Sequence, residues 1–238
     1  MTARGGTHQV VTTEHVGVPG FVPSTSGLHF INAFPSEPAI QIPLPDGQQL
    51  ALGNAANGLC GGMAFTARDY FEAGRTPPDD TSPPAEGSPL FEWLVSRLLA
   101  SFNLPLGIMR YVELMTPLLP NAGHLPVTRA RVMLEREWPT IKQELDSGHP
   151  SALGLIKVIS ADVHDIGKNH QVLAYGYTLN GTDLALDIYD PNYPNDDSVR
   201  LSLSVGNPSA PAAITYSPGE AVYCFFHTPY AAPAGPPP

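Results

Sequence analysis

The fold depends first on the stretch Asn57-Gly58-Leu59-Cys60-Gly61-Gly62-Met63, which leads into a run of helical character. Apolar residues recur at helical spacing as far as Phe71, and Gly74 is a typical stop, so we expect a helix from Cys60 to about Glu72. A helix N-terminus carries partial positive charge and free N–H groups, which favour a thiolate and can hold an oxyanion. The glycines allow a substrate backbone to approach closely. The stretch therefore predicts a nucleophilic cysteine.

The rest of the chain divides into a helical part, about residues 58–147, and a strand-rich part, about residues 150–228. Further helices are expected at residues 90–102, 107–115 and 128–147, the last with a break at Trp138-Pro139. Strands are expected at residues 152–159, 171–178, 184–189, 199–205 and 221–226. Helices followed by strands predict an α+β protein, with a helical layer that carries Cys60 packed on an antiparallel sheet.

A second part of the predicted site comes from a hairpin in the strand-rich half. A thiol nucleophile needs a base, usually a histidine that an acid or amide orients. His170 begins one predicted strand, and the next strand ends at Asp190-Pro191-Asn192. The predicted turn at Asn180-Gly181 lies about midway between His170 and Asp190. A hairpin with this turn brings Asp190 or Asn192 near His170.

The order cysteine, histidine, then aspartate or asparagine resembles that of the papain-like cysteine peptidases. The greatest similarity is to the peptidases that remove double-glycine leaders, where an aspartate before proline completes the triad. The resemblance covers roughly residues 50–70 and 150–230. It implies a papain-like fold with Cys60 as nucleophile, His170 as base and Asp190 as the orienting group. Its substrate would be a peptide or amide bond, and no metal or organic cofactor is expected.

The resemblance also implies an oxyanion-hole amide six residues before the cysteine, normally a glutamine. This chain has Asn54 there, which is one methylene shorter, and Asn57 competes for the role. Two other functional classes fit the same residues. One is a non-catalytic binding protein of papain-like fold, and the other is a deamidase or a transglutaminase-type acyl transferase.

A competing motif is Asp162-Val163-His164-Asp165-Ile166-Gly167-Lys168-Asn169, which resembles the signature of cobalamin-binding domains, where the histidine ligates cobalt. Its His164-Asp165 pair also resembles the metal-binding run of HD-domain phosphohydrolases. In the α/β cobalamin-binding domains this loop leads into a helix, and the HD domains are all-helical, whereas a strand-like sequence follows here. We therefore expect a polar loop that joins two strands and delivers His170.

Composition limits the remaining possibilities. The formal charge of the 238 residues is −10 and no cluster of Lys or Arg occurs, which argues against nucleic acid or an anionic membrane surface as partner. The two cysteines are too few for a disulfide framework, and Cys224 lies in an apolar run typical of a buried strand.

No apolar run is long enough to span a membrane and no signal peptide is visible, so a cytoplasmic protein is the default expectation. We expect a flexible arm over residues 1–26, one domain over residues 27–230 and a disordered proline-rich tail over residues 231–238. The sequence does not determine the oligomeric state.

Overall fold

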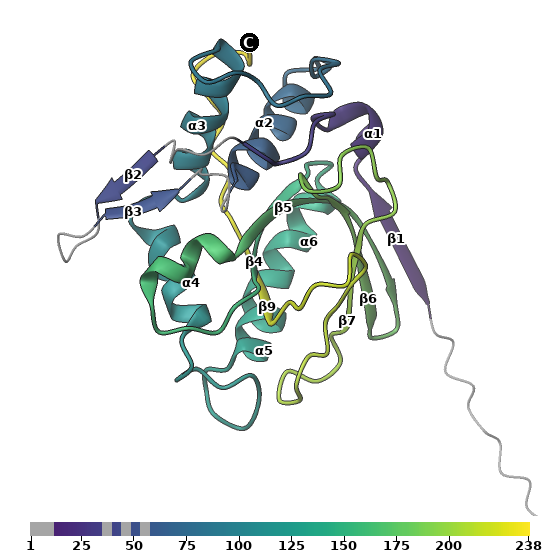
Figure 1. Ribbon diagram of the computed structural model, residues 1–238. Helices are drawn as coiled ribbons and strands as arrows, with labels where there is room; N and C mark the ends of the chain where they lie inside the picture. Colours follow the sequence, from purple (N-terminus) through teal and green to yellow (C-terminus); the bar gives the residue numbers. More distant parts are fainter. Residues whose placement is uncertain (1–11, 35–39, 44–48, 53–57) are drawn as a thin grey trace, which may run out of the picture.

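The protein is α+β, with helices packed against a curled antiparallel sheet (Figure 1). The computed structural model describes residues 12–34, 40–43, 49–52 and 58–238. The helical elements are α1 (Pro23–Ser26), α2 (Cys60–Glu72), α3 (Pro89–Ser101), α4 (Leu106–Met115), α5 (Arg129–Arg131), the π-helical η1 (Val132–Glu137), α6 (Trp138–Asp146) and the 3₁₀ helix η2 (Val163–Lys168). Within the described ranges, no helix has the length and apolar character needed to cross a bilayer.

The strands form one large sheet and one separate hairpin. They are β1 (Thr13–Gly17), β2 (Ile40–Pro43), β3 (Gln49–Leu52), β4 (Ser151–Ile156), β5 (His170–Asn180), β6 (Asp183–Tyr189), β7 (Arg200–Ser204), β8 (Thr215–Tyr216) and β9 (Cys224–His227). The large sheet has the order β8-β7-β6-β5-β4-β9, and β1 is a further neighbour of β5. Strands β2 and β3 pair only with each other among the described strands.

Strand β5 is the centre of the large sheet. On one edge its first half pairs with β4 and its second half pairs with β1, while β6 pairs along the other edge. A tight turn joins β5 to β6 after the pair Asn180 and Asp183, and Gly181 there has the positive φ of 62° that favours glycine. This hairpin places the start of β5 beside the end of β6, as the sequence predicted.

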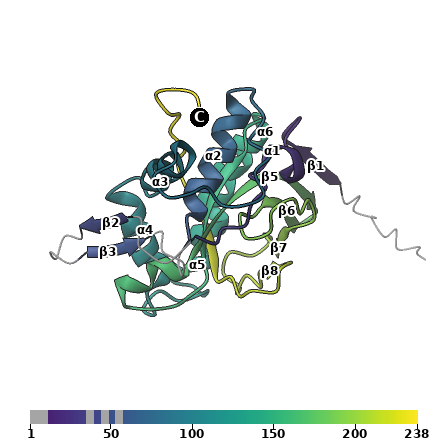
Figure 2. The same ribbon diagram turned by 45° about the horizontal axis from the view of Figure 1, so that its top comes forward.

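Helix α2 packs against both β5 and α3 (Figures 1 and 2). The close approach to α3 requires Gly62, because a Cβ atom there would collide with the carbonyl oxygen of Leu94. The following turns of α2 are buried on nearly every side, and their buried apolar residues include Met63, Phe65 and Tyr70. Helix α6 packs against β1, β4, β5 and β9. The helix that carries Cys60 is thus held between a second helix and the central strand.

The described part of the N-terminal segment, residues 12–26, differs from the flexible arm that the sequence predicted over residues 1–26. Residues Thr13–Gly17 form strand β1, and Phe21 is buried in the core. The Glu14 carboxylate accepts hydrogen bonds from Lys142 Nζ at 2.9 Å and from the Tyr177 hydroxyl at 2.7 Å. These contacts, together with the pairing on β5, hold a polar strand that has little apolar surface of its own.

The C-terminal tail, residues 231–238, has no regular secondary structure but contacts the helical layer where the sequence predicted disorder. The Tyr70 hydroxyl donates a hydrogen bond to the carbonyl oxygen of Pro238 at 2.6 Å. Arg97 Nη2 donates to the carbonyl oxygen of Ala231 at 2.8 Å. The tail therefore follows α2 and α3, at the end of α2 opposite to Cys60.

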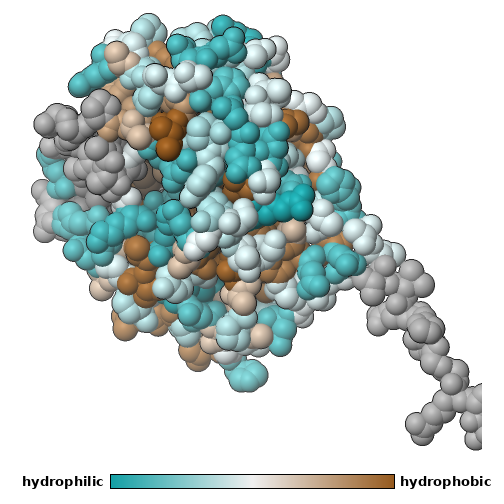
Figure 3. All heavy atoms as spheres, turned by 45° about the vertical axis from the view of Figure 1, so that its right-hand side comes forward, coloured by the Kyte–Doolittle hydropathy of each residue, from teal (hydrophilic) through white to brown (hydrophobic). Residues whose placement is uncertain are grey.

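On the face of the molecule in Figure 3, hydrophobic residues form small groups separated by hydrophilic ones. Helix α4 and the residues before it carry several exposed apolar side chains, namely Leu104, Leu106, Met109 and Val112. Scattered exposure of this kind is ordinary for a folded protein.

Candidate active site

Cys60 is the first residue of α2, and its side chain is buried, with 8% of its surface exposed. Among the described residues no side chain caps the start of this helix at Leu59, and N–H groups in a first helical turn have no partner within the helix. Burial alone acts to raise the pKa of the Cys60 thiol. The positive charge of His170, a hydrogen bond with it, and the backbone of Gln171 and Gly61 together outweigh burial, so the pKa lies below its usual value.

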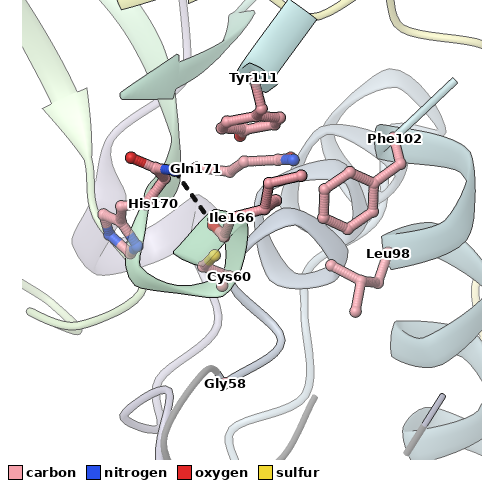
Figure 4. Close-up of a pocket in the computed structure, with 10 residues that line it drawn as sticks. Gly58, Cys60, Leu98, Phe102, Tyr111, Ile166, His170 and Gln171 are labelled. Atoms are coloured by element: carbon pink, nitrogen blue, oxygen red, sulfur yellow. Dashed lines mark hydrogen bonds between the residues drawn. The ribbon is translucent and has the colours of Figure 1, made fainter. Parts of the chain in front are cut away.

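His170 is the first residue of β5, and its imidazole lies beside the Cys60 sulfur (Figure 4). His170 Nε2 and Asp190 Oδ1 are 2.7 Å apart, and both side chains are almost fully buried. Burial disfavours the imidazolium, but the negative charges of Asp190 and Cys60 overcome this effect and raise the pKa of His170 to about 10. The two shifts both act in the direction of a thiolate–imidazolium pair.

Asp190 follows the last residue of β6, and three groups besides burial control its ionisation. Burial acts to raise its pKa, but the charge of His170 and hydrogen bonds from Tyr216 and Asn192 bring the pKa below its usual value. The Tyr216 hydroxyl donates to Oδ2, and the Asn192 N–H donates to Oδ1 at 2.8 Å. Asp190 is thus held as a carboxylate that accepts from the imidazole.

The structure separates the two alternatives that the sequence left open for the acid. Asp190, not Asn192, lies within hydrogen-bond distance of His170. The Asn192 side chain instead accepts a hydrogen bond from Asn32 Nδ2 at 3.0 Å. The two oxyanion candidates, Asn54 and Asn57, lie outside the described residues, and their role stays a prediction.

Asn32 is a member of the site that the sequence did not predict. Its Oδ1 accepts a hydrogen bond from the backbone N–H of Leu59 at 2.6 Å. The backbone N–H of Asn32 donates to the carbonyl oxygen of Pro191 at 3.0 Å. It therefore joins the residue before Cys60 to the loop after Asp190. Asn32 and Tyr216 lie in segments with no motif, so only the packed structure could identify them.

The cobalamin-like run forms η2, the short helix between β4 and β5. The His164 imidazole lies 2.8 Å from the Asp162 carboxylate on the surface, and Lys168 pairs with Asp165 at 2.6 Å. Over the part of the chain that the structure describes, no three His, Cys, Asp or Glu side chains are placed to hold a metal ion. The run leads directly into β5, and Ile166 forms part of the cavity wall beside Cys60.

This cavity has a volume of about 20 Å³, and Figure 4 shows it beside Cys60. Its apolar wall comes from α3 and the residue after it, from α4 and from η2, and the residues are Leu98, Phe102, Tyr111 and Ile166. Such a volume is enough for about one water molecule. Among the described residues, Cys60 therefore borders a small, mostly apolar hollow rather than a wide cleft.

Comparison of the chain with protein-family models, with curated proteins and with solved structures finds no match. The functional assignment consequently depends on the chemistry of the site. Its most informative feature is the imidazole of His170, which lies between a thiol and a carboxylate that are 130 positions apart in the sequence.

Proposed function

We propose that the protein is a cysteine hydrolase of papain-like fold that cleaves a peptide or amide bond. The proposal rests on one observation, the buried series of Cys60, His170 and Asp190. Each member perturbs the ionisation of the next in the direction that thiol catalysis requires. A cysteine with a purely structural role would gain nothing from a buried imidazolium beside it.

In the proposed reaction, the Cys60 thiolate attacks the carbonyl carbon of the amide, and the C–N bond breaks after a tetrahedral intermediate forms. His170 gives its proton to the leaving amine, and the acyl group remains on sulfur as a thioester. Water then attacks the thioester while His170 removes one of its protons. The acid is released, the proton returns to the Cys60–His170 pair, and Asp190 keeps the imidazole in its orientation throughout.

The oxyanion of the intermediate needs donors that are already in place. The N–H of Cys60 is one candidate, because it belongs to the first turn of α2 and has no partner within the helix. Asn54 remains the predicted second donor.

A peptide library incubated with the protein and analysed by mass spectrometry tests this proposal. The wild type should release defined cleavage products, and Cys60→Ala should reduce the rate by about 10⁴-fold or more, because it removes the nucleophile. Cys224→Ala is the matched control, since Cys224 is a buried cysteine on β9 and β4 lies between β9 and the strand of His170; it should keep the activity. A melting curve for each variant checks that it is folded.

A thiol-reactive probe distinguishes a catalytic site from a binding protein that retains the cysteine. In the proposed hydrolase, Cys60 reacts faster than a free thiol at neutral pH, and His170→Ala removes the advantage. If Cys60 reacts no faster than an ordinary thiol and His170→Ala has no effect on the rate, the catalytic proposal fails.

A further inference from the structure

Gln171 is a buried polar side chain that the proposed reaction does not use. It follows His170 on β5, and only 3% of its surface is exposed. Neither its side-chain oxygen nor its side-chain nitrogen has a hydrogen-bond partner among the residues that the structure describes. Buried amides are almost always paired in native proteins, so an unpaired one indicates a strained or functional group.

The surroundings of this amide bring it to the nucleophile. Gln171 lines the cavity beside Cys60 (Figure 4), and its side-chain oxygen packs over Gly61, the residue after the nucleophile. A Cβ atom at Gly61 would collide with that oxygen and with the Ser101 hydroxyl. The glycine at this position therefore makes room for the amide next to the thiol.

The neighbouring residues do not satisfy the amide. The Ser101 hydroxyl donates to the carbonyl oxygen of Leu98 at 2.7 Å. Burial raises the pKa of Tyr111, and the facing Gln171 amide opposes this effect, but the two groups are not placed for a regular hydrogen bond. The two N–H donors and the acceptor oxygen of the Gln171 side chain thus remain available to whatever enters the cavity.

We propose that Gln171 is a specificity-determining residue, whose side-chain amide binds an N–H-bearing amide group of the substrate next to the carbonyl that Cys60 attacks. This inference rests on the proposed thiol chemistry. An amide carries one acceptor and at least one donor, which complement the free donors and acceptor of Gln171. A hollow of about 20 Å³, which is room for about one water molecule, admits only the N–H end of such a group and excludes a bulky substituent on its nitrogen.

Three small electrophiles test this without knowledge of the natural substrate. Iodoacetamide, N,N-dimethyl-2-iodoacetamide and iodoacetonitrile react alike: the thiolate forms a bond to the CH₂ carbon and iodide leaves. Only iodoacetamide has an unsubstituted amide. Rates at Cys60, each divided by the rate at free N-acetylcysteine, should favour iodoacetamide over both other probes by roughly tenfold, the effect of one or two hydrogen bonds.

Gln171→Met removes the amide at similar length and should abolish this preference without slowing the reaction with iodoacetonitrile. Gln143→Met is the matched control, because Gln143 is exposed on α6, and it should keep the preference. A wild-type protein with no preference, or a preference that survives in Gln171→Met, would overturn the inference. The absence of a preference in the wild type needs no variant, so it would overturn the inference even if Gln171→Met is unstable.

These outcomes are distinct from failure of the proposed function. If the hydrolase proposal is wrong, all three probes react at Cys60 no faster than at a free thiol, and His170→Ala changes none of the rates. If only the role of Gln171 is wrong, the fast and His170-dependent reaction remains, but the three probes show no selectivity that depends on Gln171.

Discussion

Cys60 and Cys224 are both buried, yet their surroundings move their ionisation in opposite directions. Cys224 lies on β9, where burial, with a further contribution from the negative charge of Glu137, raises the pKa of its thiol to about 12. The thiol lies 3.4 Å from the carbonyl oxygen of Phe225, which accepts from an S–H and disfavours a thiolate. Cys60 lies at a helix start beside His170, and its pKa is lowered despite burial.

The difference shows which part of the Cys60 environment matters. Burial is the largest single influence on both thiols, and in both it favours the neutral form. Arg110 and Arg129 oppose burial at Cys224, but their effect is too small to reverse it. At Cys60 the imidazolium is itself stabilised by Asp190, so the positive charge remains beside the sulfur. The Asp190 carboxylate, which reaches Cys60 only through His170, therefore accounts for the opposite pKa shifts of the two thiols.

The largest effect is expected for His170→Ala, which removes the positive charge beside Cys60 but not beside Cys224. We expect the rate of Cys60 alkylation at pH 6 to fall about 100-fold, because an ordinary thiol is almost entirely protonated at that pH. Alkylation of Cys224 in the native protein should be slow in both forms. Mass spectrometry of peptides after timed iodoacetamide treatment measures both cysteines in one sample. Equal rates at the two positions in the wild type would contradict the comparison.

The next test concerns the pH range of activity. The lowered pKa of Cys60 sets its acid limit, and the pKa of His170, about 10, sets its alkaline limit, because the leaving amine needs a protonated imidazole. Asp190→Asn removes the negative charge that raises the His170 pKa, so the alkaline limit should move down by about 1–3 pH units. The profile of kcat/KM for a library peptide measures this shift. An unchanged alkaline limit would mean that Asp190 does not control the imidazole.

The smallest effect is expected for Asn32→Ala. This variant changes how the start of α2 is held and leaves the charges of Cys60, His170 and Asp190 in place. The variant removes the acceptor for the Leu59 N–H and the contact to Asn192. We expect about a fivefold loss of kcat, the effect of one hydrogen bond of about 1 kcal/mol, with the same pH limits as the wild type. Asn32→Asp keeps the acceptor at Leu59 and should recover part of the rate. A shifted pH profile would show that Asn32 acts on ionisation instead.

Much of the local structure could be predicted because it depends on short-range signals. The helix Cys60–Glu72 matches the predicted range, since its apolar spacing and the glycine after it are local features. The hairpin of β5 and β6 was predicted from a turn midway between two strands. Strand β1 was missed because it is mostly exposed and has no apolar alternation, and only its pairing with β5 makes it a strand. The predicted break at Trp138-Pro139 coincides with the change from the π-helical η1 to α6, and the chain remains helical through it.

The sequence by itself determined that a cysteine begins a helix and that a histidine and an acid share a hairpin, because helical period and turn chemistry act over a few residues. Only the tertiary structure decided that His170 lies between the Cys60 thiol and Asp190, and that Tyr216 and Asn32 hold the acid and the helix start. It also decided that the Gln171 amide is buried beside Cys60 without a hydrogen-bond partner among the described residues. Such contacts join segments far apart in the chain, and they depend on how the helical layer packs on the sheet rather than on any local pattern.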